Sequence, residues 1–423
     1  MEFTVSRNSL LQALQHTRCA ISPKGCSYDP YKSFVFTFGE DEQKMVMTIH
    51  ASDGELWMTE RVMLDEDPVE PRSIALWYSD LLRAIKSLDE QPLRFEVGES
   101  QMTVHHSVGS FRLPLENCAN EFLEIPRPCP EAEAEDCSIL NFEAPALRSV
   151  LGRCCFAMAQ DELRPVMNGV YVNLTSNFSD FVSSDGHKLV RVRKRSLYGS
   201  KYLVSCGNET EMSLILPSRI VRTLLKVLPS TGDIEIQYQE ELTKTKKTRD
   251  SQRRVTTHEI QERKAQCLIV IDDTLTLAFN PVEGKYPRYW TVIPDSWNIQ
   301  MSVDRKALIK SCDRLSLFAN ESSGLMLLDL DRNTLRLKTE DADFSLAGDE
   351  QLPCFTEYHD RRSPVSLRIG MKCPSLSQTL KALSSEKVCM HLVDSSRAVI
   401  VTPQPQPDNE EVTMLLMPML YND

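Results

Sequence analysis

Hydrophobic residues recur at helical spacing in three similar stretches of the chain. In residues 216–228, isoleucine, valine and leucine fall three and four positions apart, which places them on one helical face. Pro217 and Ser218 favour a helix start, because proline suits the first turn and a serine hydroxyl can accept from an unpaired backbone N–H. Residues 79–88 and 374–383 repeat the pattern, including an aliphatic residue followed by lysine near the end. Three copies predict an internal repeat.

A second helix is predicted near the start of each third of the chain, after a short alternating strand. These helices cover residues 7–18, 145–156 and 304–315, so they recur at intervals of roughly 140 to 160 residues. Further alternating runs predict strands at residues 1–5, 33–38, 44–50, 56–63, 93–97, 102–106, 110–113, 139–142, 170–173, 234–238, 299–303, 325–330 and 334–338. Each third is therefore expected to be an α+β unit, with two helices on a mostly antiparallel sheet.

A chain of 423 residues favours two or three domains. Prolines and an acidic run precede residue 137, and further prolines lie between residues 287 and 294. We therefore expect three repeated domains, at residues 1–126, 137–285 and 297–423.

The composition is that of a globular protein, with 41% hydrophobic and 26% charged residues. No run of about 18 apolar residues predicts a membrane span, and the first residues do not resemble a signal peptide. The thirteen cysteines are an odd number and form no C-x-x-C motif. This favours free thiols in a reducing cytoplasm over a disulfide framework or a zinc site.

The formal net charge of −12 argues, taken alone, against nucleic-acid binding. However, basic residues concentrate on the predicted helices, as in the stripe of Arg219, Arg222 and Lys226. A single charged helix face is usually only solvated. Repeated on equivalent helices, the bias favours a positive surface that follows a phosphate backbone without reading bases.

Two segments do not fit the repeat. Residues 240–266 are highly charged, and we interpret them as a solvated hairpin or mobile loop, with a DNA contact as the alternative. Residues 403–411 are rich in proline and predict a connector between strands.

Four spaced motifs, at residues 161–169, 183–189, 284–289 and 417–419, accompany the threefold repeat. With these motifs the chain resembles, along its whole length, the bacterial sliding clamp, the β subunit of DNA polymerase III. The resemblance implies a head-to-tail dimeric ring of clamp domains whose helices line a hole for duplex DNA. It also implies a non-catalytic processivity factor without a cofactor or metal, acting at the nucleoid in the cytoplasm. Its partners would be the replicative polymerase, the clamp loader and repair polymerases.

The resemblance also assigns roles to residues. A pocket for partner peptides would be lined by Met167, Ser184, Gly186, His187, Lys188, Leu189, Pro287, Thr291, Val292, Met417, Pro418 and Met419. DNA contacts would come from Lys24, Arg83, Lys86, Arg148, Arg153, Arg164, Arg219, Arg222, Lys226, Lys306, Lys310 and Arg314. The ring joint would combine Phe111 and Leu113 with Leu317 and Phe318.

This chain departs from the family pattern in two places. Thr291 occupies a position that is often arginine, and residues 420–423 extend past the usual end of the family. Both departures leave the preferred partner peptide open.

The sequence also allows two other classes of protein. An enzyme could use Asp185 and His187 as an oriented base, but Asp-Gly more often forms a tight turn. His105 and His106 are adjacent in a predicted strand and so point to opposite faces, which disfavours a metal pair. The other alternative is a repeat scaffold that binds proteins only and does not form a ring.

Overall fold

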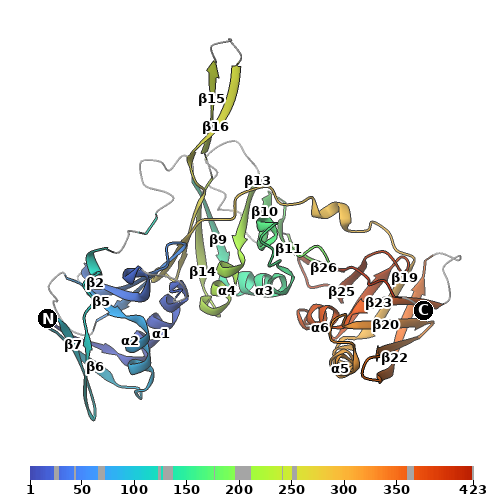
Figure 1. Cartoon of the computed structure of the whole chain (residues 1–423), viewed down its shortest axis with the longest axis horizontal. Helices are drawn as coiled ribbons and strands as arrows, with labels where there is room; N and C mark the ends of the chain where they lie inside the picture. Colours follow the sequence, from blue (N-terminus) through green and yellow to red (C-terminus); the bar gives the residue numbers. More distant parts are fainter. Residues whose placement is uncertain are drawn as a thin grey trace. The chain divides into compact units, whose positions relative to one another are not determined.

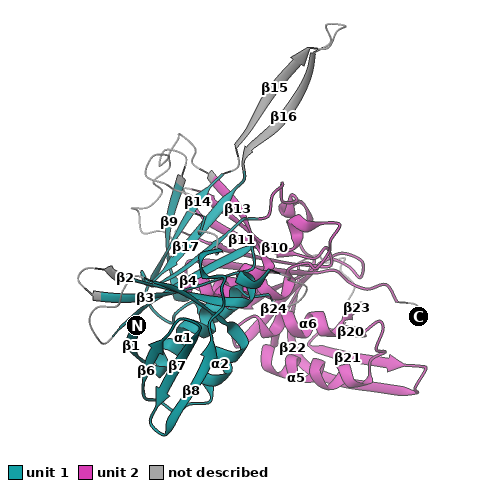
Figure 2. Cartoon of the chain, turned by 60° about the vertical axis from the view of Figure 1, so that its left-hand side comes forward, with its two compact units in different colours: residues 1–145, 200–209, 226–281 teal, residues 146–199, 210–225, 282–423 magenta. Residues whose placement is uncertain are grey.

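The computed structural model describes residues 1–22, 28–41, 44–64, 72–121, 125–126, 137–175, 177–195, 211–240, 242–249, 255–359 and 366–421. The described chain forms two compact units (Figure 2). The first contains residues up to 145 and residues 226–281, and the second contains residues 146–195, 211–225 and 282–421. The division into three repeated domains remains a prediction.

The first unit contains two antiparallel sheets. The larger has the strand order β5 (Ser73–Trp77), β2 (Ser33–Asp41), β3 (Lys44–Ser52), β4 (Leu56–Met63), β18 (Leu275–Phe279), β17 (Gln266–Ile271), β14 (Asp233–Gln239) and β9 (Cys137–Glu143). The smaller has the order β1 (Glu2–Ser6), β6 (Pro92–Val97), β7 (Gln101–His106) and β8 (Gly109–Pro114). Helices α1 (Arg7–Thr17) and α2 (Tyr78–Lys86) lie side by side in this unit (Figure 1).

The second unit contains one twelve-stranded antiparallel sheet. Its order is β13 (Glu211–Pro217), β10 (Gly169–Thr175), β11 (Ser179–Ser184), β12 (Lys188–Lys194), β26 (Glu410–Leu416), β25 (Val399–Gln404), β24 (Lys387–Leu392), β19 (Ile299–Asp304), β22 (Leu346–Tyr358), β21 (Thr334–Asp341), β20 (Leu325–Asp331) and β23 (Ser366–Lys372). Helices α5 (Arg305–Leu315) and α6 (Cys373–Lys381) pack against each other.

The remaining elements also match the sequence pattern. Helices α3 (Ala144–Cys154) and α4 (Ser218–Val227) complete the six that the repeat predicts. Strands β15 (Leu242–Arg249) and β16 (Val255–Arg263) form the hairpin expected in the charged segment. Every predicted strand is present. Asp304, predicted as the first residue of a helix, instead caps α5, since its carboxylate accepts from Ala307 N at 2.7 Å.

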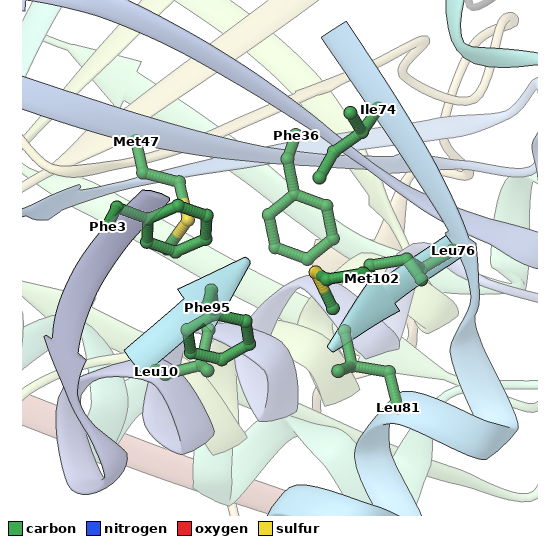
Figure 3. A pocket seen from close by; sticks show the side chains of 9 residues that line it. All are labelled: Phe3, Leu10, Phe36, Met47, Ile74, Leu76, Leu81, Phe95 and Met102. Atoms are coloured by element: carbon green, nitrogen blue, oxygen red, sulfur yellow. The ribbon is translucent and has the colours of Figure 1, made fainter. Parts of the chain in front are cut away.

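Apolar side chains from both helices and both sheets fill the core of the first unit. Figure 3 shows nine of them around a void of about 10 Å³. They are Phe3, Leu10, Phe36, Met47, Ile74, Leu76, Leu81, Phe95 and Met102. A void of that size holds at most one water, and this lining offers a water no polar partner. The void is therefore a packing defect of a dry core, not a ligand site.

We expect Leu81→Ala to lower the free energy of unfolding by about 2–5 kcal/mol, because it enlarges this void and removes buried apolar contacts. Chemical denaturation followed by fluorescence measures the change. Leu163→Ala is the matched control, since Leu163 is 91% exposed, and it should change stability by less than about 0.5 kcal/mol. Equal losses in both variants would contradict the packing described here.

Candidate functional site

The turn between β11 and β12, with the strand ends on either side of it, carries five of the predicted pocket residues. Asp185 Oδ1 accepts from the backbone N–H groups of His187 and Lys188, both at 2.9 Å. Gly186 has φ +91°, a conformation that side chains disfavour. The Asp-Gly-His segment is therefore the tight turn favoured by the sequence, and Asp185 orients backbone instead of a base. Leu189 is buried at the start of β12.

A loop after α3 lies against this turn. Asp161 accepts from Leu163 N at 2.9 Å and from Arg164 Nε at 2.8 Å, and the hydrogen bond from Arg164 lowers the pKa of the Asp161 carboxyl. A Cβ at Gly186 would lie 3.2 Å from the Arg164 guanidinium. Arg164, predicted to contact DNA, thus already has an acidic partner. Met167, at the end of the loop, is buried.

A buried carboxylate, paired with a partly exposed arginine, holds the segment that follows β18. Asp180 on β11 is fully buried, and both of its oxygens accept from Arg193 at 2.7 Å. Tyr289 donates its hydroxyl to Asp180 Oδ2 at 2.7 Å. Burial, and then the charge of Asp180, raise the pKa of Tyr289, so its hydroxyl remains a donor at neutral pH. These bonds supply the partners that a buried carboxylate requires.

Ring stacking adds a second anchor to the same segment. Tyr286 stacks on Tyr171 of β10, with ring centroids 4.8 Å apart and planes 9° apart. Pro287, which lies between the two anchored tyrosines, is exposed, and so are Thr291 and Val292, which follow Tyr289. The anchors therefore present these three predicted pocket residues at the surface on a fixed backbone.

The C-terminal segment supplies the last predicted pocket residues. Met417 N donates to His187 O at 2.8 Å, which places Met417 directly beside the β11–β12 turn. Met417 is 43% exposed and Val292 is 55% exposed. Both are large apolar side chains available to a ligand.

One hydrophobic cluster links these segments. It contains Leu189, Tyr286, Tyr289 and Leu415, with Val166 packed against it. The turn, the loop, the tyrosine segment and the C-terminal strand therefore meet around a shared apolar core. Sequence motifs identified candidate surface residues, but the anchors Tyr171, Asp180 and Arg193 were missed, because no motif marks ring stacking or an ion pair between neighbouring strands.

Most of the residues predicted to contact DNA are exposed: Lys86, Arg83, Arg148, Arg164, Arg222, Lys226, Lys306, Lys310 and Arg314. Two of these exposed arginines pair with acidic residues of the chain, Arg83 with Asp80 and Arg314 with Glu350, and the less exposed Arg153 pairs with Glu410. Arg219 is half-buried, and Lys24 lies outside the described residues.

Arg153 differs most from the expectation of an exposed contact. Its side chain is only 14% exposed and its Glu410 partner 7% exposed. Burial lowers the pKa of the guanidinium. This pair joins α3 to β26, which leaves little of Arg153 for a phosphate.

The residues predicted to form the ring joint lie on or near two strands, each of which has an edge that pairs with no described strand. Phe111 and Leu113 are on β8, which pairs only with β7 among the described strands. Leu317 and Phe318 form a 3₁₀ turn after α5 and are 74% and 39% exposed. Residues 346–353 of β22 pair with β21 on one side and with no described strand on the other.

The described residues contain no cluster of side chains suited to a metal ion, and His105 lies beside Glu96, 3.2 Å away. Nine cysteines in the described part of the chain are free thiols. Cys154 is fully buried, as expected for a small apolar side chain, and Cys155 only partly. None of the helices in the described ranges is long and apolar enough to cross a membrane.

Comparisons with known proteins agree with this architecture. Family models match residues 141–275 as the central domain and 290–420 as the C-terminal domain of the DNA polymerase III beta subunit. The beta sliding clamp of Pseudomonas putida is 25% identical over 430 residues, covering 99% of this chain and 100% of the relative. That of Staphylococcus epidermidis is 21% identical over 431 residues, covering 99% of both.

Solved structures share the fold over the full length of both chains. The DNA polymerase III beta subunit of Pseudomonas aeruginosa aligns with a TM-score of 0.77 and 21% identity. That of Thermotoga maritima aligns with a TM-score of 0.80 and 18% identity.

Together these matches define a protein of the clamp class, with its repeated α+β architecture. The chain belongs to the family of DNA polymerase III β subunits, the sliding clamps, which are non-catalytic processivity factors. The family, the fold and the function predicted from the sequence are thereby confirmed, and the protein-only scaffold is not favoured.

We expect Tyr289→Phe to lower the free energy of unfolding by about 1–3 kcal/mol, because it removes one hydrogen bond from a buried carboxylate. Tyr171→Phe is the control: it keeps the ring that stacks on Tyr286 and leaves the Asp180 network intact. Chemical denaturation of both variants tests this. A Tyr289→Phe variant as stable as the control would show that Asp180 does not depend on this hydroxyl.

Proposed function

We propose that two copies of this chain close head to tail into a ring that encircles duplex DNA. The whole-length relation to sliding clamps, over 99% of this chain and 100% of a relative, carries this proposal. Each chain would contribute three clamp domains, residues 1–126, 137–285 and 297–423. The ring tethers the replicative polymerase at the nucleoid and makes synthesis processive.

The ring joint forms between β8 of one chain and the β22 region of the other. Both strands have an unpaired edge among the described strands; Phe111 and Leu113 on β8 are half-buried, and Leu346 on β22 is 40% exposed. Pairing of the edges satisfies backbone N–H and C=O groups that are otherwise solvated. Phe111 and Leu113 then pack on Leu317 and Phe318, giving the apolar centre of a head-to-tail contact.

Partner proteins bind through short peptides at the site described above. Exposed Met417 and Val292 suit aliphatic and aromatic anchors, and methionine adapts to differently shaped side chains. The same site can therefore serve the replicative polymerase, the clamp loader and repair polymerases in turn. Exposed helix residues such as Arg222 and Lys310 contact phosphates, so the ring slides without reading sequence.

Replacing both Leu317 and Phe318 with aspartate should break the ring, because two charges then enter an apolar contact. Light scattering should give a mass near twice 48.2 kDa for the unaltered protein and near one chain for the variant. Leu163→Asp, also at an exposed leucine but outside the joint, should stay dimeric. An unchanged mass in the double variant would refute this joint.

The same proteins test encirclement directly. The unaltered protein, loaded on nicked circular DNA, should remain bound through gel filtration and be released when the circle is linearised. The Leu317/Phe318 variant should not be retained on either form. Equal retention on circular and linear DNA would contradict a topological link and favour ordinary binding.

Replacing Arg222 and Lys226 with glutamine should weaken binding to short linear duplexes. Each lost phosphate contact should reduce the slope of log affinity against log salt by about 0.9. Fluorescence anisotropy over a salt series measures this on two duplexes of unrelated sequence, which should respond alike. Arg336→Gln is the control, since Arg336 pairs with Asp349 between strands. A slope unchanged by the double substitution would remove α4 from the DNA-facing surface.

A further inference from the structure

The end of the described chain adds a short antiparallel segment to the edge of β23. Met419 pairs with Gly370, and its N–H donates to Gly370 O at 2.8 Å. Two residues later, the Tyr421 hydroxyl donates to Arg368 O at 3.2 Å. Because β20 occupies the other side of β23, the C-terminal residues cover an edge that is otherwise unpaired among the described strands.

The lack of a side chain at Gly370 makes room for this segment. A Cβ at this position would lie 2.6 Å from Met419 O and 3.1 Å from Tyr421 Cδ1, and the first of these separations is too short for a real side chain. The tail thus rests directly on the strand backbone. Close approach of two backbones is a common reason for glycine inside a strand.

Tyr421 and Leu420 differ sharply in their surroundings. The Tyr421 side chain is half-buried and lines a groove of about 380 Å³, together with Leu325 and Leu327. Leu420 is 93% exposed. Of the two described residues that follow Met419, the tyrosine therefore makes the attachment.

This attachment lies directly after the C-terminal wall of the peptide site, residues 417–419. The Met417 N–H donates to His187 O at one end of the wall, and Gly370 and Arg368 hold the other end. The wall spans from the β11–β12 turn to the edge of β23. Without Tyr421, the end of the wall at β23 would be held only by the pairing of Met419 with Gly370.

We propose that Tyr421, seated on Gly370 and Arg368, acts as a latch that holds residues 417–419 ready for a partner peptide. The proposal rests on the peptide site proposed above. A wall ordered before binding does not lose freedom when the peptide arrives, so affinity is higher and dissociation slower. Tyr421 is a positioning residue, and it need not touch the peptide.

Four variants separate the latch from other effects of the tail. Tyr421→Ala removes the ring, Tyr421→Phe removes only the hydroxyl, and a chain ending at Met419 removes the extension. Leu420→Ala is the matched control, because it truncates the neighbouring exposed side chain. The probe is a fluorescein-labelled short peptide that carries one leucine and one phenylalanine anchor, with affinity from anisotropy and dissociation rate from competition.

Tyr421→Ala and the truncated chain should bind the peptide about tenfold more weakly through faster dissociation, and Tyr421→Phe about threefold. Leu420→Ala should match the unaltered protein. The mass of the protein and its midpoint of denaturation should not change, since the latch acts on the wall and not on the fold. Gly370→Ala, which keeps the whole tail but crowds its seat, should also speed dissociation.

Unchanged or tighter peptide binding by Tyr421→Ala would overturn the latch, and tighter binding would mean that the tail obstructs the site. Deletion of residues 417–423 separates this failure from failure of the site itself. If that deletion abolishes binding while Tyr421→Ala does not, the site stands and the latch is wrong. If the deletion leaves affinity unchanged, the peptide site and the latch are both wrong.

Discussion

The candidate site depends on one fully buried carboxylate. Asp180 is stable in the apolar interior only because Arg193 and Tyr289 both donate to it. The three residues come from two neighbouring strands and from a segment about a hundred residues further along the chain. Their bonds fix the backbone on which Pro287 and Val292 are presented, so the shape of an exposed site is set by a charge interaction beneath it.

Elsewhere in the chain, some basic residues are paired within the fold and others are exposed. Arg153 and the exposed Arg314 are paired with glutamates within the fold, and Arg222 and Lys310 are also exposed on helices. A chain with a formal charge of −12 can therefore still present local positive surface. The positive charge counted on a helix from its sequence is larger than its net charge in the fold, because acidic residues of distant strands neutralise part of it.

Hydrophobic periodicity predicted the helices well and the strands unevenly. All six helices are present, since each carries apolar residues at helical spacing. Strand β11 was missed because its serines and aspartate are all buried, so no alternation marks it. Strand β22 was missed for the opposite reason: its residues alternate only between exposed and half-buried, and it contains a proline.

The sequence by itself determined the family and the helices, and it singled out the residues of the candidate site, because motifs and periodicity are local properties. Only the tertiary structure decided that Arg153 faces Glu410, that Tyr289 reaches Asp180, and that Tyr421 rests on Gly370. Each of these contacts joins residues more than fifty positions apart. Such pairings follow from strand order and packing, which no single stretch of sequence encodes.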